Sequence, residues 1–195
     1  MTPPPPAPSA RTLPRTLPDL LRPDLDLVFA GINPSLHSAR IGHYYGHPGN
    51  GFWRALSASC LTPWPVTPDD DRRLPATCGI GFTDVVKRVV TDSRTVSDGE
   101  LRDATPSFRR RIAYARTRAL CFTTTRAFAL LFPGVREAGA WGRQPVTLEG
   151  AEVWVMPSTS GRAVAWRDQV RGVLDGLARD LGRAPRGTLA ALRER

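Results

Sequence analysis

The chain is poor in cysteine, almost without lysine, and contains no long apolar run. Its 195 residues include three scattered cysteines (Cys60, Cys78 and Cys121) and no Cys-x-x-Cys pair. This pattern excludes a structural zinc ribbon and a four-cysteine iron–sulfur site built from this chain alone, and it fits core thiols in a reducing compartment. No apolar stretch approaches the length that spans a bilayer, and residues 1–20 lack the apolar core of a signal peptide. We therefore expect a cytoplasmic protein with no membrane partner.

Positive charge is carried almost entirely by arginine. Lysine and arginine together number 27, Lys87 is the only lysine, and 18 acidic residues leave a formal net charge of +9. The guanidinium group is planar, and its fork of donors matches phosphate oxygens and base edges. Nucleic acid is therefore the expected partner, although an arginine-rich surface also arises from genome composition.

Composition divides the chain into a proline-rich start, a body and a basic end. Residues 1–22 hold many prolines and predict a flexible arm that buries no core. Residues 23–182 have the length of one domain, and residues 183–195 are expected to form a basic tail.

Short apolar runs alternate with amphipathic segments along the body. The expected strands cover residues 27–32, 79–82, 119–122 and, on either side of a Glu-Gly turn, 146–148 and 153–156. Helices are expected from residue 50, from the Ser-x-x-Glu capping box at 97–100, after 123–125 and across 170–181. Pro106 is expected to break or restart the second helix, and residues 35–51 are too irregular for an element. The alternation predicts an α/β fold with a mostly parallel sheet between helices.

Ligands of such sheets bind in loops beyond the carboxyl ends of the strands, which nominates the loops that begin at Asn33, Thr91 and Pro157. The Asn33 amide leaves a strand on a proline turn, where it can orient a water molecule without the desolvation cost of a charge. In the third loop, three hydroxyls, a glycine and an arginine suit phosphate binding. Each loop also has a purely structural interpretation, as a strand end or a helix cap.

All three histidines lie close together in the chain, at His37, His43 and His47. No cysteine or carboxylate occurs between Leu27 and Cys60 to complete a ligand set, so we expect polar loop residues and no metal.

Five short motifs occur together in a particular order. They are Gly31-Ile32-Asn33-Pro34-Ser35, His47-Pro48-Gly49-Asn50 with Phe52-Trp53, Gly81-Phe82-Thr83, Trp141-Gly142-Arg143-Gln144 and Met156-Pro157-Ser158-Thr159-Ser160. In this order and spacing the chain resembles the mismatch-specific uracil/thymine-DNA glycosylases, over residues 25–181. The resemblance implies a three-layer αβα sandwich around a short, mostly parallel sheet, of the uracil-DNA glycosylase type.

The resemblance also implies an activity. Such enzymes act without a cofactor: they flip uracil out of DNA and hydrolyse its N-glycosidic bond with water, which leaves an abasic site for base excision repair. Asn33 would position the water, and the base pocket would comprise Gly31, Ile32, Ser38 and Tyr45. The DNA wedge and the phosphate contacts would comprise Ser158, Thr159, Ser160, Gly161 and Arg162. We expect a monomer; acceptance of thymine or damaged pyrimidines, and of single strands, stays open.

The sequence departs from the family pattern at two places. Lys87 stands where such enzymes often carry an acid. Our hypothesis is that Asp92 helps to activate the water or balances the cationic transition state, and the alternative is a surface residue that precedes a helix. Asp84 is the competing acid, with a helix cap as its alternative role. Thr123-Thr124-Thr125 replaces an expected Gly-Lys, a loss that Arg126 could offset. The alternative to an enzyme is a non-catalytic nucleic-acid binder on the same scaffold.

Overall fold

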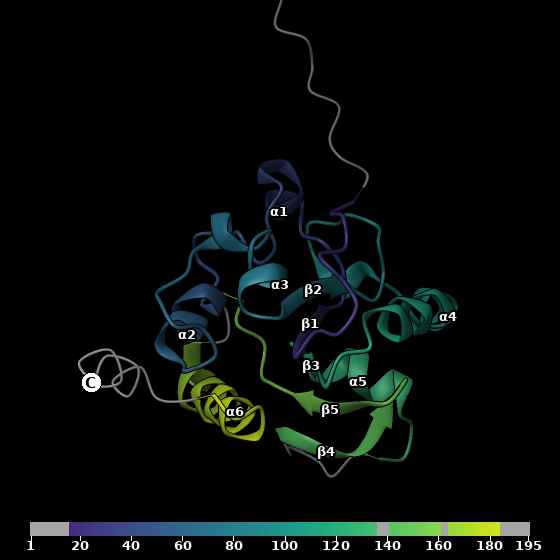
Figure 1. Cartoon of the computed structure of the whole chain (residues 1–195). Helices are drawn as coiled ribbons and strands as arrows, with labels where there is room; N and C mark the ends of the chain where they lie inside the picture. The colour runs from purple at the N-terminus through teal and green to yellow at the C-terminus, as the bar shows by residue number, and fades with distance from the viewer. Residues whose placement is uncertain (1–15, 136–140, 161–163, 184–195) are drawn as a thin grey trace, which may run out of the picture.

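One central sheet organises the molecule. The computed structural model describes residues 16–135, 141–160 and 164–183 (Figure 1). The sheet has five strands in the order β2-β1-β3-β5-β4, and each neighbouring pair is parallel except β4 and β5. The strands are β1 (Leu27–Gly31), β2 (Ile80–Asp84), β3 (Ala119–Phe122), β4 (Gly142–Leu148) and β5 (Ala151–Val155). The mostly parallel sheet is thus confirmed.

Helices cover both faces of this sheet, as Figure 1 shows. The described helices are α1 (Leu36–Ile41), α2 (Phe52–Ala58), α3 (Leu74–Thr77), α4 (Asp98–Ala115), α5 (Thr125–Leu131) and α6 (Arg167–Asp180). Short 3-10 turns occur at η1 (Pro68–Asp70), η2 (Ser93–Thr95) and η3 (Val164–Trp166). Helices α2, α3 and α6 pack on one face and α4 and α5 on the other, which confirms the three-layer αβα sandwich.

Strand β1 joins the two cores because its side chains alternate between the faces of the sheet. Leu27 and Phe29 pack in the core under α2 and α6, whereas Val28 and Ala30 pack in the core under α4 and α5. All five residues of β1 are buried, as the continuous apolar run predicts for a central parallel strand.

The β4–β5 hairpin lies where the sequence predicts it, although β4 begins at Gly142 instead of residue 146. Glu149 and Gly150 have φ angles of 51° and 84°, a left-handed pair that closes a tight antiparallel turn.

Helix α4 differs from the expectation, because it runs through Pro106 without a break. Pro106 is exposed, so the backbone carbonyl that loses its partner faces water. Leu101, Phe108 and Ile112 are fully buried on both sides of the proline and hold the two halves of the helix against the sheet.

Helix α1 was not expected either, since it lies in the glycine- and histidine-rich stretch 35–51. The Ser35 side chain accepts a hydrogen bond from the Ser38 amide at its start, and Gly42 closes its end with a φ of 81°. Six residues between such caps are too few to show a helical apolar period.

The segment before β1 packs on the domain, although residues 1–22 are predicted to be a flexible arm. Leu17 is only 2% exposed, and Leu20 exchanges two backbone hydrogen bonds with Phe82 at the edge of β2. The rest of the predicted arm (1–15) and most of the predicted tail (184–195) lie outside the described residues. Within the described part of the chain, no helix combines the length and apolarity needed to cross a membrane.

Phe29 provides a test of this packing. Its ring lies 5.0 Å from that of Phe52 and 6.0 Å from that of Phe82, and its side chain is fully buried. We predict that Phe29→Ala lowers the free energy of unfolding by about 3 to 5 kcal/mol, because it leaves a cavity beneath α2. Urea denaturation measures this loss. Tyr114→Ala on exposed α4 surface is the control and should change stability little; equal losses would refute the assignment.

Candidate active site

A cavity of about 800 Å³ lies at the carboxyl ends of the parallel strands. Its lining contains residues from all three nominated loops, including Asn33, Asp92 and Ser160. The end of β2 and the residues after β3 contribute Asp84, Thr123 and Thr124. The structure therefore brings the three loops together, as the strand-end rule predicts.

The approach of Gly31 and Asp84 shapes this cavity. The two residues are register partners at the ends of β1 and β2. A Cβ atom on Gly31 would lie 2.3 Å from Asp84 Oδ1 and 3.5 Å from the Tyr45 hydroxyl. Any side chain at position 31 would therefore displace the Asp84 carboxyl, so the glycine is needed for close approach rather than for a turn.

Asp84 is a buried carboxyl with spare hydrogen-bonding capacity. It is 3% exposed, and its Oδ2 atom has no hydrogen-bond partner in the described part of the chain. Burial raises the pKa of the Asp84 carboxyl to about 7, against the opposing effect of the Lys87 ammonium. The Asp19 carboxylate raises this pKa further and Arg111 lowers it. A group with these properties exchanges a proton near neutral pH.

Asn33 presents a second buried acceptor to the same cavity. Its Nδ2 atom donates to the Pro34 carbonyl oxygen at 2.8 Å, which fixes the orientation of the amide. Its Oδ1 atom is buried and has no hydrogen-bond partner among the described residues. A buried acceptor of this kind costs free energy unless something binds it, so the amide oxygen is suited to hold a water molecule.

Tyr45 contributes an aromatic wall. Its ring stacks on Phe52 at 4.1 Å, and its hydroxyl lies 3.4 Å from Thr123 Oγ1. Burial raises the pKa of the Tyr45 phenol well above its ordinary value, so the group stays neutral. Its φ angle of 51° lies in the left-handed region, which is uncommon outside glycine and is found at sites under constraint.

Ser38 lies in the lining and also braces the loop. Its hydroxyl accepts from the Gly46 amide at 3.1 Å and lies 3.0 Å from Ser35 Oγ. These contacts fix the segment that carries Tyr45.

The histidines do not converge. His37 and His47 line the cavity with ring centroids 5.1 Å apart, whereas His43 is bound to Asp71 at 3.0 Å, outside the lining. Over residues 16–135, 141–160 and 164–183, no group of three His, Cys, Asp or Glu side chains is placed to hold a metal ion.

Asp92 lines the cavity but is bound to Arg94. Both of its carboxylate oxygens accept from the Arg94 guanidinium, at distances from 2.5 to 3.1 Å. Asp92 Oδ1 also accepts from the Arg94 amide, so the side chain caps η2. The sequence places Asp92 and Asp84 at the same edge of the sheet, but only the structure distinguishes the exposed, paired carboxylate from the buried one.

The third loop reaches the cavity through Ser158 and Ser160, whose hydroxyls lie 3.1 Å apart. Thr159 is mostly buried, and its carbonyl accepts from the Gly51 amide at 2.8 Å, which ties the loop to the start of α2. Gly161 and Arg162, the predicted wedge, lie outside the described residues. Arg126 is engaged elsewhere, since it binds Asp98 at 2.6 Å together with backbone carbonyls of the Ser93–Val96 segment.

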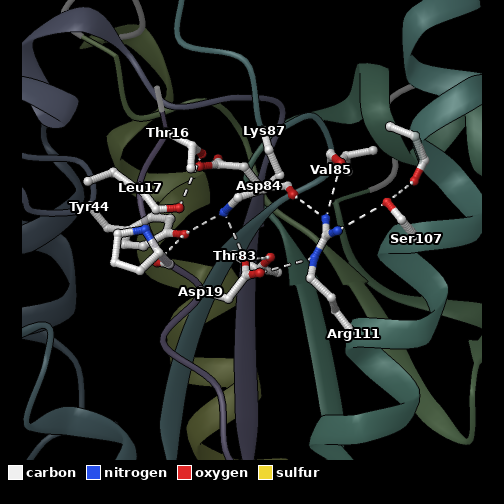
Figure 2. A network of polar contacts seen from close by, with 12 residues as sticks. Thr16, Leu17, Asp19, Tyr44, Thr83, Asp84, Val85, Lys87, Ser107 and Arg111 are labelled. Carbon is white, nitrogen blue, oxygen red and sulfur yellow. Dashed lines mark hydrogen bonds and ion pairs between the residues drawn. The ribbon is translucent and has the colours of Figure 1, made fainter. Parts of the chain in front are cut away.

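A charged network lies behind Asp84 (Figure 2). Asp19 stands between Lys87, which donates to its Oδ1 at 2.9 Å, and Arg111, whose Nε lies 3.4 Å from its Oδ2. Arg111 also donates to the carbonyl oxygens of Asp84 and Val85, at 2.7 and 3.2 Å. Sequence reasoning missed Asp19 and Arg111, because they lie far from Asp84 in the chain and belong to no motif.

The buried Asp84 carboxyl generates a prediction about stability. Its pKa in the folded protein is above the ordinary aspartate value, so the folded state binds the proton more tightly than the unfolded chain does. The contribution of Asp84 to stability must then fall as the pH rises from about 4 to about 7. We predict that Asp84→Asn gains melting temperature relative to the wild type between pH 5 and pH 8. Asp103→Asn, at an exposed position on α4, is the control; a difference for Asp84→Asn that does not grow with pH would contradict the burial argument.

Comparison with known proteins agrees with this fold. A solution NMR structure of a candidate uracil DNA glycosylase from Methanosarcina acetivorans is similar, with a TM-score of 0.56 and 24% sequence identity over 84% of this chain and 97% of that chain. The family model described as the uracil DNA glycosylase superfamily matches residues 18–181. The match extends from the segment that carries Asp19 to the end of α6, and it includes the described lining of the cavity apart from Leu17. The chain belongs to the uracil DNA glycosylase superfamily.

Proposed function

We propose that this chain is a monofunctional DNA glycosylase that removes uracil from mismatched DNA and leaves an abasic site. One observation carries the proposal: Asn33 and Asp84 each have a side-chain oxygen without a hydrogen-bond partner among the described residues, and both line one cavity, at the edge of the sheet where ligands of such folds bind. Membership of the superfamily supports a DNA glycosylase activity in general. The net charge of +9, mostly arginine, supports DNA as the partner.

The target base must leave the duplex, because its glycosidic bond cannot be reached inside the stack. In the proposed complex the base lies against Tyr45, with the backbone of Gly31 and Ile32 and the Ser38 hydroxyl along its edge. Ser158, Thr159 and Ser160 contact the phosphates beside the lesion, while Gly161 and Arg162 fill the space that the base vacates.

The proposed reaction is hydrolysis without a covalent enzyme intermediate. The Asn33 amide oxygen accepts a hydrogen bond from the water and thereby orients the water oxygen toward C1′ of the sugar. As the C1′–N1 bond breaks, its electron pair leaves with the base, and a new bond forms between the water oxygen and C1′. A carboxylate near the sugar stabilises the cationic transition state and takes the water proton, which then passes to the departing base.

Among the described residues two carboxylates line the cavity, and their contacts favour Asp84 as the proton acceptor. Asp92 engages Arg94 with both oxygens, and its side chain is 36% exposed. Asp84 is buried, and its Oδ2 atom has no hydrogen-bond partner in the part of the chain that the structure describes. Burial raises its pKa to about 7, close to the value that makes a general base effective at neutral pH. Asp92 is then left to balance charge at the mouth of the cavity.

The first test removes the amide. We predict that Asn33→Ala lowers the single-turnover rate of uracil release by at least about a hundredfold, because the water loses its orientation. Labelled duplexes with uracil or thymine opposite guanine or adenine, and a uracil-bearing single strand, are incubated with protein in chelator and then cleaved with alkali. DNA binding, measured by fluorescence anisotropy, should persist in the variant. A wild-type protein that binds DNA but releases no base would be the non-catalytic binder.

The second test compares the two carboxylates by the same substitution. Asp84→Asn should lower single-turnover uracil release by at least about tenfold, whereas Asp92→Asn should lower it less than about threefold. The amide keeps the shape of each side chain but cannot accept a proton at neutral pH. The opposite ranking of the two variants would assign the proton transfer to Asp92.

A further inference from the structure

Lys87 is an exception in the composition of the chain. It is the only lysine among 27 basic residues, so at this position alone the chain uses an ammonium instead of a guanidinium. The side chain is 27% exposed, and its Nζ atom donates to Asp19 Oδ1 at 2.9 Å and to the Tyr44 hydroxyl at 3.4 Å. A compact ammonium fits between a carboxylate and a phenol, whereas a planar guanidinium would need a wider space and different acceptors.

This ammonium lies behind the site rather than in it. Lys87 is not part of the cavity lining. Its charge lowers the pKa of Asp84, which does line the cavity. Figure 2 shows the Lys87 side chain beside Asp84, with its nitrogen turned to Asp19 and Tyr44. Lys87 is therefore not placed to contact a base or a sugar in the cavity, and we consider its effect on the nearest titratable lining residue.

The charges that face Asp84 come from three elements. Lys87, beyond the end of β2, and Arg111, on α4, favour the ionised carboxylate, while Asp19, in the segment before β1, opposes it. Among these charges the Lys87 ammonium has the largest effect. The neighbouring phenols of Tyr44 and Tyr45 carry no charge, because burial raises the pKa of both groups far above neutrality.

Arg111 cannot replace Lys87 in this arrangement. One of its terminal nitrogens is taken up by the carbonyl oxygens of Asp84 and Val85, and its Nε faces Asp19. Removal of the Lys87 charge would therefore leave the buried carboxyl with the Asp19 charge and with a cation that is already shared.

We propose that Lys87 is a positioning residue that acts through Asp84: its ammonium, held in place by Asp19, keeps the Asp84 carboxyl ionised in the cavity so that it can accept the proton of the water. This inference rests on the proposed glycosylase function and deepens it. It gives a role to the residue at which the chain departs from the family pattern.

The test is the pH dependence of uracil release under single-turnover conditions. In the wild type the rate should rise with pH and level off above a midpoint near the Asp84 pKa of about 7. Lys87→Gln, which removes the charge but keeps a donor for Asp19, should move this midpoint up by about 1 pH unit. At pH 7 the variant should be several-fold slower, and at high pH its rate should recover to the wild-type plateau.

Three controls separate this role from a structural one. Lys87→Arg retains a positive charge, although at a different geometry, and should keep the midpoint closer to that of the wild type than Lys87→Gln does. Arg88→Met removes a positive charge one residue away, from an exposed pair with Glu100, and should leave the profile unchanged. Lys87→Met, without a donor, should shift the midpoint as Lys87→Gln does. A Lys87→Gln rate that is lowered equally at every pH would overturn the proposal and make Lys87 a brace for Asp19.

A second measurement does not depend on catalysis. The carboxyl carbon of Asp84, followed by NMR in protein without DNA, should titrate at higher pH in Lys87→Gln than in the wild type. If it does not, the inference fails whatever the activity. If it does and the wild type releases no uracil, the electrostatic role stands and the proposed function fails. In the Asp84→Asn background, Lys87→Gln should have no further effect on the rate.

Discussion

The contact between Gly31 and Asp84 is the constraint on which the candidate site depends. Parallel pairing of β1 and β2 places these residues opposite each other, where both strands end. Because position 31 has no side chain, the carboxyl can lie across the end of β1, in the space that a Cβ atom would occupy. Two further groups follow this pair closely in the chain: Asn33, in the cavity lining, comes two residues after the glycine, and Lys87, outside the lining, comes three residues after the aspartate.

Burial of a carboxyl is unfavourable unless the protein surrounds it with compensating groups. Here the compensation is indirect: Lys87 and Arg111 do not bind the Asp84 carboxyl in the described structure but bind Asp19 and backbone carbonyls around it. The acid is thereby neither neutralised by a direct ion pair nor left in a purely apolar pocket. A direct partner would have lowered its basicity, and an apolar pocket would have kept it protonated.

Much of this architecture follows from local patterns. The apolar runs predicted β1, β2, β3 and β5, because a buried parallel sheet needs continuous apolar segments. Of β4, at the antiparallel edge, they predicted only the last three residues. The Ser97 capping box predicted the start of α4. The strand-end rule predicted that the loops of Asn33, Asp92 and Ser160 lie together, and all three line the cavity. These features depend on residues near one another in the chain.

The features that sequence patterns did not provide depend on distant contacts or on exposure. Pro106 is tolerated because its side of α4 faces water, and short α1 is defined by caps rather than by a period. The contacts of Asp19 join residues 64 to 92 positions apart, at spacings that no motif encodes. Asp84 and Asp92 also differ in burial, although the strand-end rule places both at the same edge of the sheet.

A carboxyl with a pKa near 7 meets two opposing requirements of the proposed reaction, since it must be ionised to accept a proton and must not repel the anionic base that leaves. The reaction creates a cationic sugar and an anionic base within a few ångströms, on a substrate that already carries phosphates. A carboxylate paired directly with a cation would accept the water proton poorly, and a permanently protonated acid could not accept it at all. A buried acid whose ionised form is favoured by nearby cations, as Lys87 and Arg111 favour that of Asp84, can accept the proton as the bond breaks. Once neutral, it no longer repels the departing anionic base. The neutral amide of Asn33 complements it, because it orients the water at every pH.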